Sequence, residues 1–313
     1  MECPLCKGAT HLDQSVSVIE LANLWKKIGV DVGSIFTSKE LGKYACTNCS
    51  LGFYFPFFPG DDAFYGKLAT WDWYYKHSGK TEYEYASQFL SPGMTVLDVG
   101  CGIGEFSEFL SKEVDFLGVD LSTKSVEIAN SLGRNVKQID ITAAPIDFLN
   151  HFDVVTCFQV LEHVVDIDGF FDSLINLCKP GGIIILAVPN NDGFIGGAVN
   201  NIFNMPPHHI FLWNKRSLHF LANKYDLIVE NYIEERVTDI HYQWFLSVMA
   251  SKFIMNLIRK PFKVIDRSLL GRLLYKLTSI LSQPLSFVLR HSDQAGQSAI
   301  IVYKKPNHKS CKG

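Results

Sequence analysis

The chain has no long uninterrupted apolar run and no strong excess of charge of either sign. Among its 313 residues, 29 are Lys or Arg and 32 are Asp or Glu, so the net charge at pH 7 is only −3. A nearly balanced charge gives no general attraction to nucleic acid, and we expect no nucleic-acid partner. No apolar run reaches the roughly 18 residues that a membrane span needs. The opening MECPLC lacks the charged and apolar regions of a secretory signal, so we expect a cytoplasmic protein.

Disulfides are rare in the cytoplasm, so the eight cysteines need another explanation. Four of them form two CxxC pairs, Cys3 with Cys6 and Cys46 with Cys49. Each pair places two sulfurs on one side of a tight turn, and two pairs complete a tetrahedral shell with no open position. The sequence therefore predicts a structural zinc site in a zinc-ribbon-like segment. The stretch SVSVIELANLWKKIG between the pairs predicts an inserted helix.

From residue 94 onward, short β-branched runs alternate with helical stretches, which predicts a parallel sheet with crossover helices. The expected fold class is α/β, with a Rossmann-like sheet. The first helix of this alternation is expected over residues 104–112. The expected domain boundaries are 1–60 for the zinc-ribbon-like segment, 61–93 for a helical connector, 94–240 for the core, 241–290 for a helical insertion, and 291–313 for a final core strand and tail.

The stretch VLDVGCGIGEF places three glycines, Gly100, Gly102 and Gly104, directly after a predicted strand. A dinucleotide-binding loop needs its third glycine where this chain has Glu105, and a P-loop needs a Lys–Ser/Thr pair that this stretch lacks. Asp98 and Glu105 flank the glycines, so a pyrophosphate would meet carboxylates. A ligand with a cationic amino group and a sulfonium is favoured instead. S-adenosylmethionine (SAM) is such a ligand.

Further candidate cofactor ligands stand at the ends of the following strands, where open α/β sheets form their binding crevice. Asp120 ends the next strand, where a carboxylate can accept hydrogen bonds from both ribose hydroxyls. Asp140 lies in QIDI, within reach of the adenine amino group, with Ile141 beside the ring. Leu121, directly after Asp120, and Gln159, at the end of a later strand, complete the predicted cofactor set.

Five stretches in order, DVGCGIGEF, GVDLS, QIDI, FQVLEHV and KPGGIIILAVPN, resemble the class I SAM-dependent methyltransferases over about residues 83–230. VLEH is similar to the branch that includes the ubiquinone-biosynthesis O-methyltransferases. KYACTNCSLGFYFP with the later FYGKL resembles zinc-ribbon methyltransferases of bacterial polysaccharide and modified-sugar pathways. The resemblance implies a seven-stranded sheet whose last strand is antiparallel. It also implies that Gly100, Gly102 and Asp120 bind SAM, with Asp98 near the methionine end and Asp140 at the adenine.

Three histidines are candidate catalytic bases, because an oxygen acceptor loses a proton during methyl transfer. His163 lies in LEHV, and His208 and His209 lie in MPPHHIFLW, which follows a glycine-rich loop. In relatives with a similar PPHHxxxW segment, Trp213 would pack on the acceptor side. The alternative is structural, with a histidine that caps a helix or bonds a carbonyl.

The segment 241–290 is apolar with helical periodicity, and prolines at 261 and 284 are expected to break it into separate helices. From 251 to 290 it carries eight Lys or Arg against one acid, Asp266. Basic amphipathic helices lie on anionic membranes, so peripheral contact at the inner membrane face is one interpretation. A helical cap over the acceptor site, or a homodimer interface, with a solvated basic face is the other.

The expected function is methyl transfer to a sugar, glycan or lipid-linked glycan acceptor in polysaccharide or modified-sugar biosynthesis. One alternative is O-methylation of a quinone precursor or other small molecule. Another is a catalytically silent scaffold that keeps the zinc segment and the SAM fold.

Overall fold

The computed structural model describes residues 1–71, 74, 81–288 and 294–307. Parts of the expected connector, insertion and tail lie outside these residues. The chain divides into two compact units. The N-terminal unit combines Met1–Gly60, Pro189–Lys215 and Glu234–Ala299, and the sheet unit combines Asp61–Val188, Arg216–Ile233 and Ile300–Gly313.

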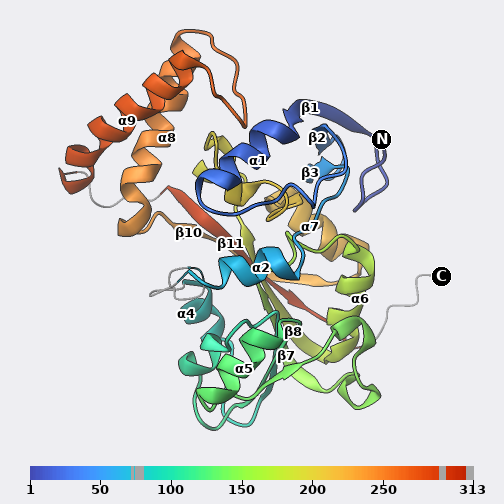
Figure 1. Cartoon of the computed structure of the whole chain (residues 1–313). Helices are drawn as coiled ribbons and strands as arrows, with labels where there is room; N and C mark the ends of the chain where they lie inside the picture. Colours follow the sequence, from blue (N-terminus) through green and yellow to red (C-terminus); the bar gives the residue numbers. More distant parts are fainter. Residues whose placement is uncertain (72–73, 75–80, 289–293, 308–313) are drawn as a thin grey trace. The chain divides into compact units, whose positions relative to one another are not determined.

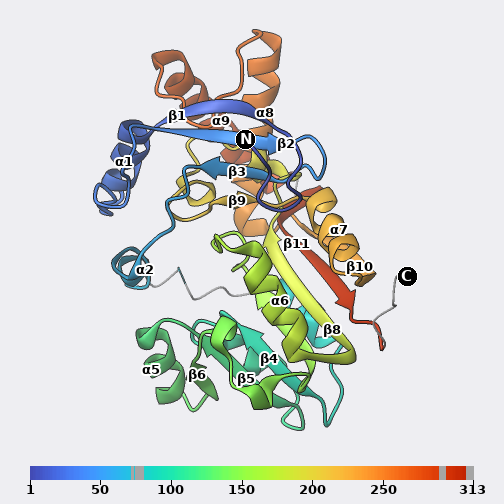
Figure 2. The ribbon, with the colours of Figure 1, turned by 90° about the vertical axis from the view of Figure 1, so that its right-hand side faces the viewer.

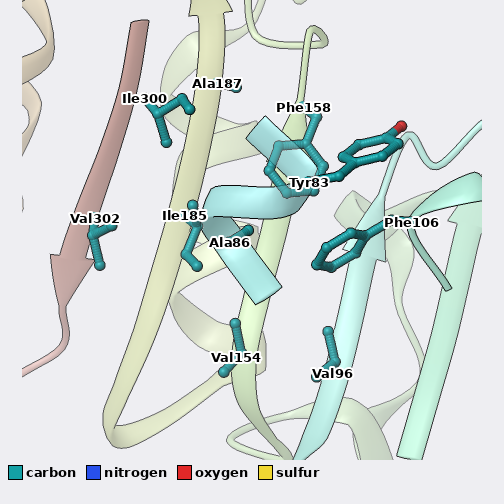
Figure 3. Packing of buried hydrophobic residues seen from close by; sticks show 10 residues of the cluster. All are labelled: Tyr83, Ala86, Val96, Phe106, Val154, Phe158, Ile185, Ala187, Ile300 and Val302. Atoms are coloured by element: carbon teal, nitrogen blue, oxygen red, sulfur yellow. The ribbon is translucent and has the colours of Figure 1, made fainter. Parts of the chain in front are cut away.

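The main sheet has seven strands in the order β10-β11-β8-β7-β4-β5-β6. The pairs β4/β5, β4/β7, β5/β6 and β7/β8 are parallel, whereas β11 runs opposite to β8 (Figure 3). This arrangement confirms the expected Rossmann-like fold with an antiparallel last strand. The strands are β4 (Thr95–Val99), β5 (Asp115–Asp120), β6 (Val136–Gln138), β7 (Phe152–Phe158), β8 (Cys178–Pro189), β10 (Ile228–Arg236) and β11 (Ala295–Lys304).

Helices of the sheet unit begin at side-chain caps that the sequence supplies. Ser122 accepts a hydrogen bond from the Ser125 amide before α5, and Asp166 does the same for Gly169 before α6. The α-helices of the strand–helix alternation and its connector are α2 (Asp62–Leu68), α4 (Thr81–Ser87), α5 (Thr123–Ser131), α6 (Ile167–Leu177) and α7 (Lys215–Lys224). The shorter 3₁₀ turns of the sheet unit are η1 (Glu105–Phe109), η2 (Ile141–Ala143) and η3 (Ile146–Phe148), and those of the N-terminal unit are η4 (Phe194–Gly197) and η5 (Ile202–Asn204).

The helix expected over residues 104–112 is only the 3₁₀ turn η1. Gly104 precedes it with left-handed backbone and no side-chain cap, and Leu110 after it is extended. The Ser107 hydroxyl donates to the Gly104 carbonyl at 2.7 Å. A start without a cap and an early extended residue leave too few residues for an α-helix.

Aromatic rings from α4, η1 and β7 form the core on one face of the sheet (Figure 3). The ring centroid of Tyr83 lies 5.3 Å from that of Phe106 and 5.1 Å from that of Phe158. The centroids of Phe106 and Phe158 are also 5.1 Å apart. The two pairs that involve Phe158 are edge-to-face, an arrangement that adds roughly 0.5–1.5 kcal/mol per pair beyond the buried area, and the Tyr83–Phe106 pair is tilted. The cluster anchors the turn after the glycine loop against the sheet.

The N-terminal unit contains an antiparallel sheet of four strands in the order β1-β2-β3-β9 (Figure 2). β9 comes from much later in the chain than its neighbour β3. The expected helix between the cysteine pairs is α1 (Val18–Lys27), and its fully buried Trp25 donates from Nε1 to the Pro206 carbonyl at 3.2 Å. The strands are β1 (Thr10–Ser17), β2 (Glu40–Cys46), β3 (Gly52–Phe55) and β9 (Phe211–Leu212).

The helical insertion lies between β10 and β11, as expected. It forms two helices that lie side by side, α8 (Asp239–Leu257) and α9 (Leu269–Val288) (Figure 1). Pro261 lies between them, but Pro284 lies inside α9, so the expected break there is wrong. The proline removes one amide donor from an exposed stretch near the helix end, where water can bond the freed carbonyl. Among the residues described, no helix has the length and apolar character needed to cross a membrane.

Candidate functional site

The glycine loop follows β4 and is shaped by its own backbone. Gly100, Gly102 and Gly104 have φ angles of +69°, +55° and +73°. Glycine adopts such left-handed values freely, whereas most other residues are strained there. A Cβ added to Gly100 would also lie 2.4 Å from Cγ2 of Val160. The loop's conformation and packing therefore require these glycines even before any ligand is considered.

A buried carboxylate lies directly before this loop. Asp98, in β4, has a relative exposure of 1%. The Thr156 hydroxyl, on the neighbouring β7, donates to Asp98 Oδ1 at 2.7 Å. Because a buried acid favours cations nearby, this position suits the cationic amino group of SAM better than a phosphate.

Asp120, at the end of β5, holds the glycine loop in place. Its Oδ2 accepts the Gly102 amide at 2.8 Å, and its Oδ1 accepts the Ser122 amide at 2.8 Å. Burial raises the pKa of Asp120, and these backbone donors oppose the rise. Each carboxylate oxygen keeps a second lone pair, so the predicted bonds to ribose hydroxyls stay compatible with the geometry.

Arg134 also supports the loop and was missed by sequence reasoning. Its Nη1 donates to the Ile103 carbonyl at 2.7 Å, and its Nη2 pairs with Glu108. A single cation ahead of a short strand has no recognisable spacing, so nothing in the sequence marked it. Because Arg134 is engaged by a carbonyl and a carboxylate, its charge is compensated at the loop.

Asp140 follows β6 and begins η2. Its Oδ1 accepts from the Thr142 amide at 2.9 Å and from the Thr142 hydroxyl at 2.7 Å. Asp140 is exposed, and the next residue, Ile141, is buried with 6% exposure. The two bonds from Thr142 orient the Asp140 carboxylate. The contact of Asp140 with adenine stays a prediction.

The remaining predicted cofactor residues differ in their surroundings. Leu121, after β5, is 66% exposed. Gln159, after β7, has a φ of +57°, and its amide donates to the Ala187 carbonyl at 2.8 Å. Like Asp120 and Asp140, they follow parallel strands at the edge of the sheet where ligands bind in such folds.

His163 lies beyond β7, and a tyrosine contacts its ring. The hydroxyl of Tyr65, on α2, is 3.1 Å from His163 Nδ1, and the two rings are nearly perpendicular at 86°. Tyr65 stands within the FYGKL stretch, which carried a family resemblance but no assigned role. The contact orients the imidazole, and the catalytic role of His163 stays a prediction.

Glu162 adds a buried acid next to this pair. Its Oε1 is 3.8 Å from Nε2 of His163, and its side chain is fully buried. Burial raises the pKa of Glu162 to about 8, and the nearby Glu82 raises it further. Glu162 therefore holds a proton at neutral pH. An imidazolium at His163 would favour its ionised form.

His208 and His209 belong to the N-terminal unit, whereas His163 and the predicted cofactor residues belong to the sheet unit. Their rings are stacked with centroids 4.4 Å apart, and each is 8% exposed. Nδ1 of His208 lies 2.9 Å from the Phe203 carbonyl, so it must carry the proton. Its Nε2 is then the basic nitrogen. Trp213, predicted on the acceptor side, is fully buried in the same unit.

The four predicted zinc ligands come together. The sulfurs of Cys3, Cys6, Cys46 and Cys49 all lie within 4.8 Å of one another. Cys3 and Cys49 are 3.6 Å apart, and Cys6 and Cys46 are 3.3 Å apart. Four thiolates around Zn²⁺ at about 2.3 Å would be about 3.8 Å apart. The hydrogen bond between Cys3 and Cys49 lowers the pKa of Cys3 and raises that of Cys49, which favours one thiolate shared with one thiol in this pair.

In each cysteine pair, a backbone amide donates a hydrogen bond to one of the two sulfurs. The Gly8 amide donates to Cys6 Sγ at 3.4 Å, and the Asn48 amide donates to Cys46 Sγ at 3.3 Å. Donors aimed at sulfur stabilise the negative charge of a metal-bound thiolate. The cluster thus has the ligand count and the surroundings of a closed tetrahedral site.

Comparison with known proteins gives a family and a set of curated relatives. The methyltransferase-domain family matches residues 74–239. The ubiquinone biosynthesis O-methyltransferase of Psychrobacter cryohalolentis is 34% identical over 109 residues, which are 32% of this chain and 42% of that protein. The protein of the same name from Bordetella bronchiseptica is 38% identical over 108 residues, with 32% and 44% covered. The chain thus spans less than half the length of these relatives.

Solved structures show similarity at low sequence identity. The SAM-dependent methyltransferase of Mesorhizobium loti is 14% identical, with 72% of this chain and 98% of that chain covered and a TM-score of 0.47. Phosphoethanolamine N-methyltransferase 2 of Haemonchus contortus, in complex with SAM, is 19% identical, with 71% and 52% covered and a TM-score of 0.46.

The expected sugar, glycan or lipid-linked glycan acceptor is wrong, because the curated relatives are named for ubiquinone biosynthesis. That expectation rested on the cysteine segment, and a cluster of four cysteines carries no information on the acceptor. The expected role in polysaccharide biosynthesis is wrong for the same reason. The match to the methyltransferase domain, in contrast, agrees with the ordered motifs. Since it covers more than half of the residues, the chain belongs to the methyltransferase-domain family, as its class I SAM-dependent motifs predicted.

Proposed function

We propose that this chain transfers the methyl group of SAM to a hydroxyl oxygen of a quinone precursor or a related small phenolic molecule. The observation that carries the acceptor class is the set of relatives at 34–38% identity named ubiquinone biosynthesis O-methyltransferase. The observation that supports the cofactor is the glycine loop, which two carboxylates flank and Asp120 holds from β5.

In this reaction the bond between the SAM methyl group and sulfur breaks as a bond from the acceptor oxygen to the methyl carbon forms. The products are S-adenosylhomocysteine and a methyl ether, and the hydroxyl proton must leave. The protein mainly aligns oxygen, carbon and sulfur and keeps water away. A positioned base then accelerates the step further.

We assign this base to His163. When Nδ1–H donates to the Tyr65 oxygen, Nε2 is left as the basic nitrogen. The proton that Nε2 accepts creates an imidazolium 3.8 Å from Glu162 Oε1. Because Glu162 holds a proton at neutral pH, its carboxyl group faces this cation as a neutral polar group and not as a counter-ion. Tyr65 is then a positioning residue for the base.

Replacement of Tyr65 by Phe tests the assignment. We expect Tyr65→Phe to lower kcat about tenfold, and His163→Ala to lower it by roughly a hundredfold or more, with SAM affinity retained in both. Tyr65→Phe should also shift the limb of the pH–rate profile that reports the base. Equal kcat and pH profiles for wild type and Tyr65→Phe would remove Tyr65 from the mechanism.

The proposed function itself is tested in two stages. Calorimetric titration with S-adenosylhomocysteine should show binding, and a labelled-SAM assay with catechol-type quinone precursors should show methyl ether formation. A folded sample that does not bind S-adenosylhomocysteine would support the scaffold alternative. Binding with no transfer to any phenolic acceptor would contradict the acceptor class alone.

We also propose that the four-cysteine cluster holds one structural Zn²⁺. The support is the set of mutual sulfur distances, below 4.8 Å, and the amides directed at Cys6 and Cys46. Four thiolates complete the coordination shell of Zn²⁺, so the ion would stabilise the N-terminal unit and take no part in the reaction.

A further inference from the structure

The outer surface of the α8–α9 hairpin is apolar. α9 exposes a row of large aliphatic side chains at helical spacing, and α8 adds Phe253 and Leu257, at 70% and 72% exposure. Within the row, Leu269 is 66% exposed, Leu273 and Ile280 are each 57% exposed, and Leu277 is 52% exposed. Positions separated by three or four residues share one helix face. These six side chains are called the apolar face of the hairpin below.

The buried side of the same hairpin combines hydroxyl side chains with apolar ones such as Leu274 and Met255. Where the two helices meet, Thr278 Oγ1 is 2.7 Å from Ser251 Oγ and 3.3 Å from Ser247 Oγ. All three side chains are buried. A water-soluble helix pair normally buries its leucines and exposes its hydroxyls. Here three hydroxyl groups are buried while most leucines of α9 face outward, which leaves an exposed apolar surface of the kind that marks an interaction site.

Exposed cations flank the apolar face. Arg272 and Lys276 each stand one position before a leucine of the row, on the same outward half of α9, and both are exposed. Arg259 and Lys263 are exposed on the segment that joins the two helices. The one acid between residues 251 and 288, Asp266, is paired with Lys260 and does not neutralise these cations. The surface is therefore apolar in its centre and positively charged at its margins.

We propose that the apolar face of the hairpin docks on an anionic phospholipid bilayer, with α8 and α9 lying in the plane of its surface. The leucines and Phe253 enter the boundary between head groups and acyl chains, while the flanking cations bind lipid phosphates. Neither helix is long and apolar enough to cross the bilayer, which restricts the contact to one leaflet. The inference is independent of the proposed reaction, because it rests only on this surface.

The test is flotation of the full chain with vesicles of phosphatidylcholine alone or with added phosphatidylglycerol. We expect binding to the anionic vesicles that weakens as salt rises. Leu273→Glu/Leu277→Glu should weaken it about tenfold or more, and Arg272→Gln/Lys276→Gln about tenfold. The matched control is Ile146→Glu, an 80% exposed apolar residue of the sheet unit, which should bind like wild type.

Two results would overturn the proposal. One is equal flotation of the wild type and both hairpin variants. The other is a wild-type dimer that Leu273→Glu/Leu277→Glu converts to a monomer without vesicle binding in either, which would make a second copy the occupant. Thermal unfolding of each variant checks that it is folded, and the glutamine variant retains every leucine if the glutamate variant fails that check.

Discussion

Single residues give the sharpest tests of the site, and Asp120 is the first. It accepts two backbone amides and is also the predicted ribose ligand. We expect Asp120→Ala to weaken S-adenosylhomocysteine binding roughly a hundredfold or more, because it removes the loop contact and the ribose acceptor together. The measurement is calorimetric titration. Asp115→Ala, at the exposed start of the same strand, is the control. Unchanged affinity in Asp120→Ala would refute the ribose role.

Glu162 makes a prediction about pH. Its pKa is raised from 4.5 to about 8, so between these values the folded protein keeps a proton that the unfolded chain releases. Its contribution to stability is therefore present below about pH 4.5 and is lost as the pH rises through about 8. We expect Glu162→Gln to remove this loss, so the variant should gain stability relative to wild type as pH increases, by an amount on the order of a few kcal/mol. Urea unfolding at several pH values measures it. A constant difference between the two proteins would contradict the buried proton.

At the scale of elements, zinc binding by the cysteine pairs and the stability of the short strands beside them can be tested with one variant. We expect Cys46→Ser to lose bound zinc and to lower the melting temperature by about 5 °C or more. S-adenosylhomocysteine binding should persist, since the glycine loop belongs to the other unit. Metal analysis by mass spectrometry is the measurement, and Cys178→Ser, in the sheet unit, is the control. Full zinc content in Cys46→Ser would exclude the four-thiolate site.

The elements that sequence reasoning found are those with a strong local pattern. The strands around the glycine loop are apolar runs, α1 and α9 have clear helical periodicity, and α8 is a long apolar stretch, so their presence could be predicted. The cysteine cluster could also be predicted, because its ligand spacing repeats. η1 could not, because its apolar residues resemble a helix while its backbone start at Gly104 is left-handed.

Other features depended on contacts between distant parts of the chain. β9 has two residues, and it is a strand only because it pairs with β3. Tyr65 meets His163 across many intervening residues, and Arg134 reaches the glycine loop from an isolated position. The acceptor was misjudged for a similar reason, since the motifs describe the cofactor sheet and a metal segment, and neither describes an acceptor pocket.

At the scale of the whole molecule, the two units predict two separable responses to ligands. S-adenosylhomocysteine should raise the unfolding temperature of the sheet unit, because a ligand that binds only the folded state stabilises it. A zinc chelator should lower that of the N-terminal unit. Scanning calorimetry should therefore show two transitions, each moved by one reagent. A single transition moved equally by both would mean that the units unfold as one.

The N-terminal sheet has a consequence for the order in which this protein is made. Residues 1–60 leave the ribosome early, but β9, the strand that pairs with β3, is translated only after the glycine loop and most of the sheet unit. Until then, the amides and carbonyls along one edge of β3 can pair with a strand of another chain, and such pairing leads to aggregation. A nascent chain of this protein therefore has a long interval of exposure. We therefore expect that chaperones which bind exposed strand edges during translation raise the yield of this protein strongly. The effect should be smaller for a protein whose sheets are each completed by neighbouring segments of the chain.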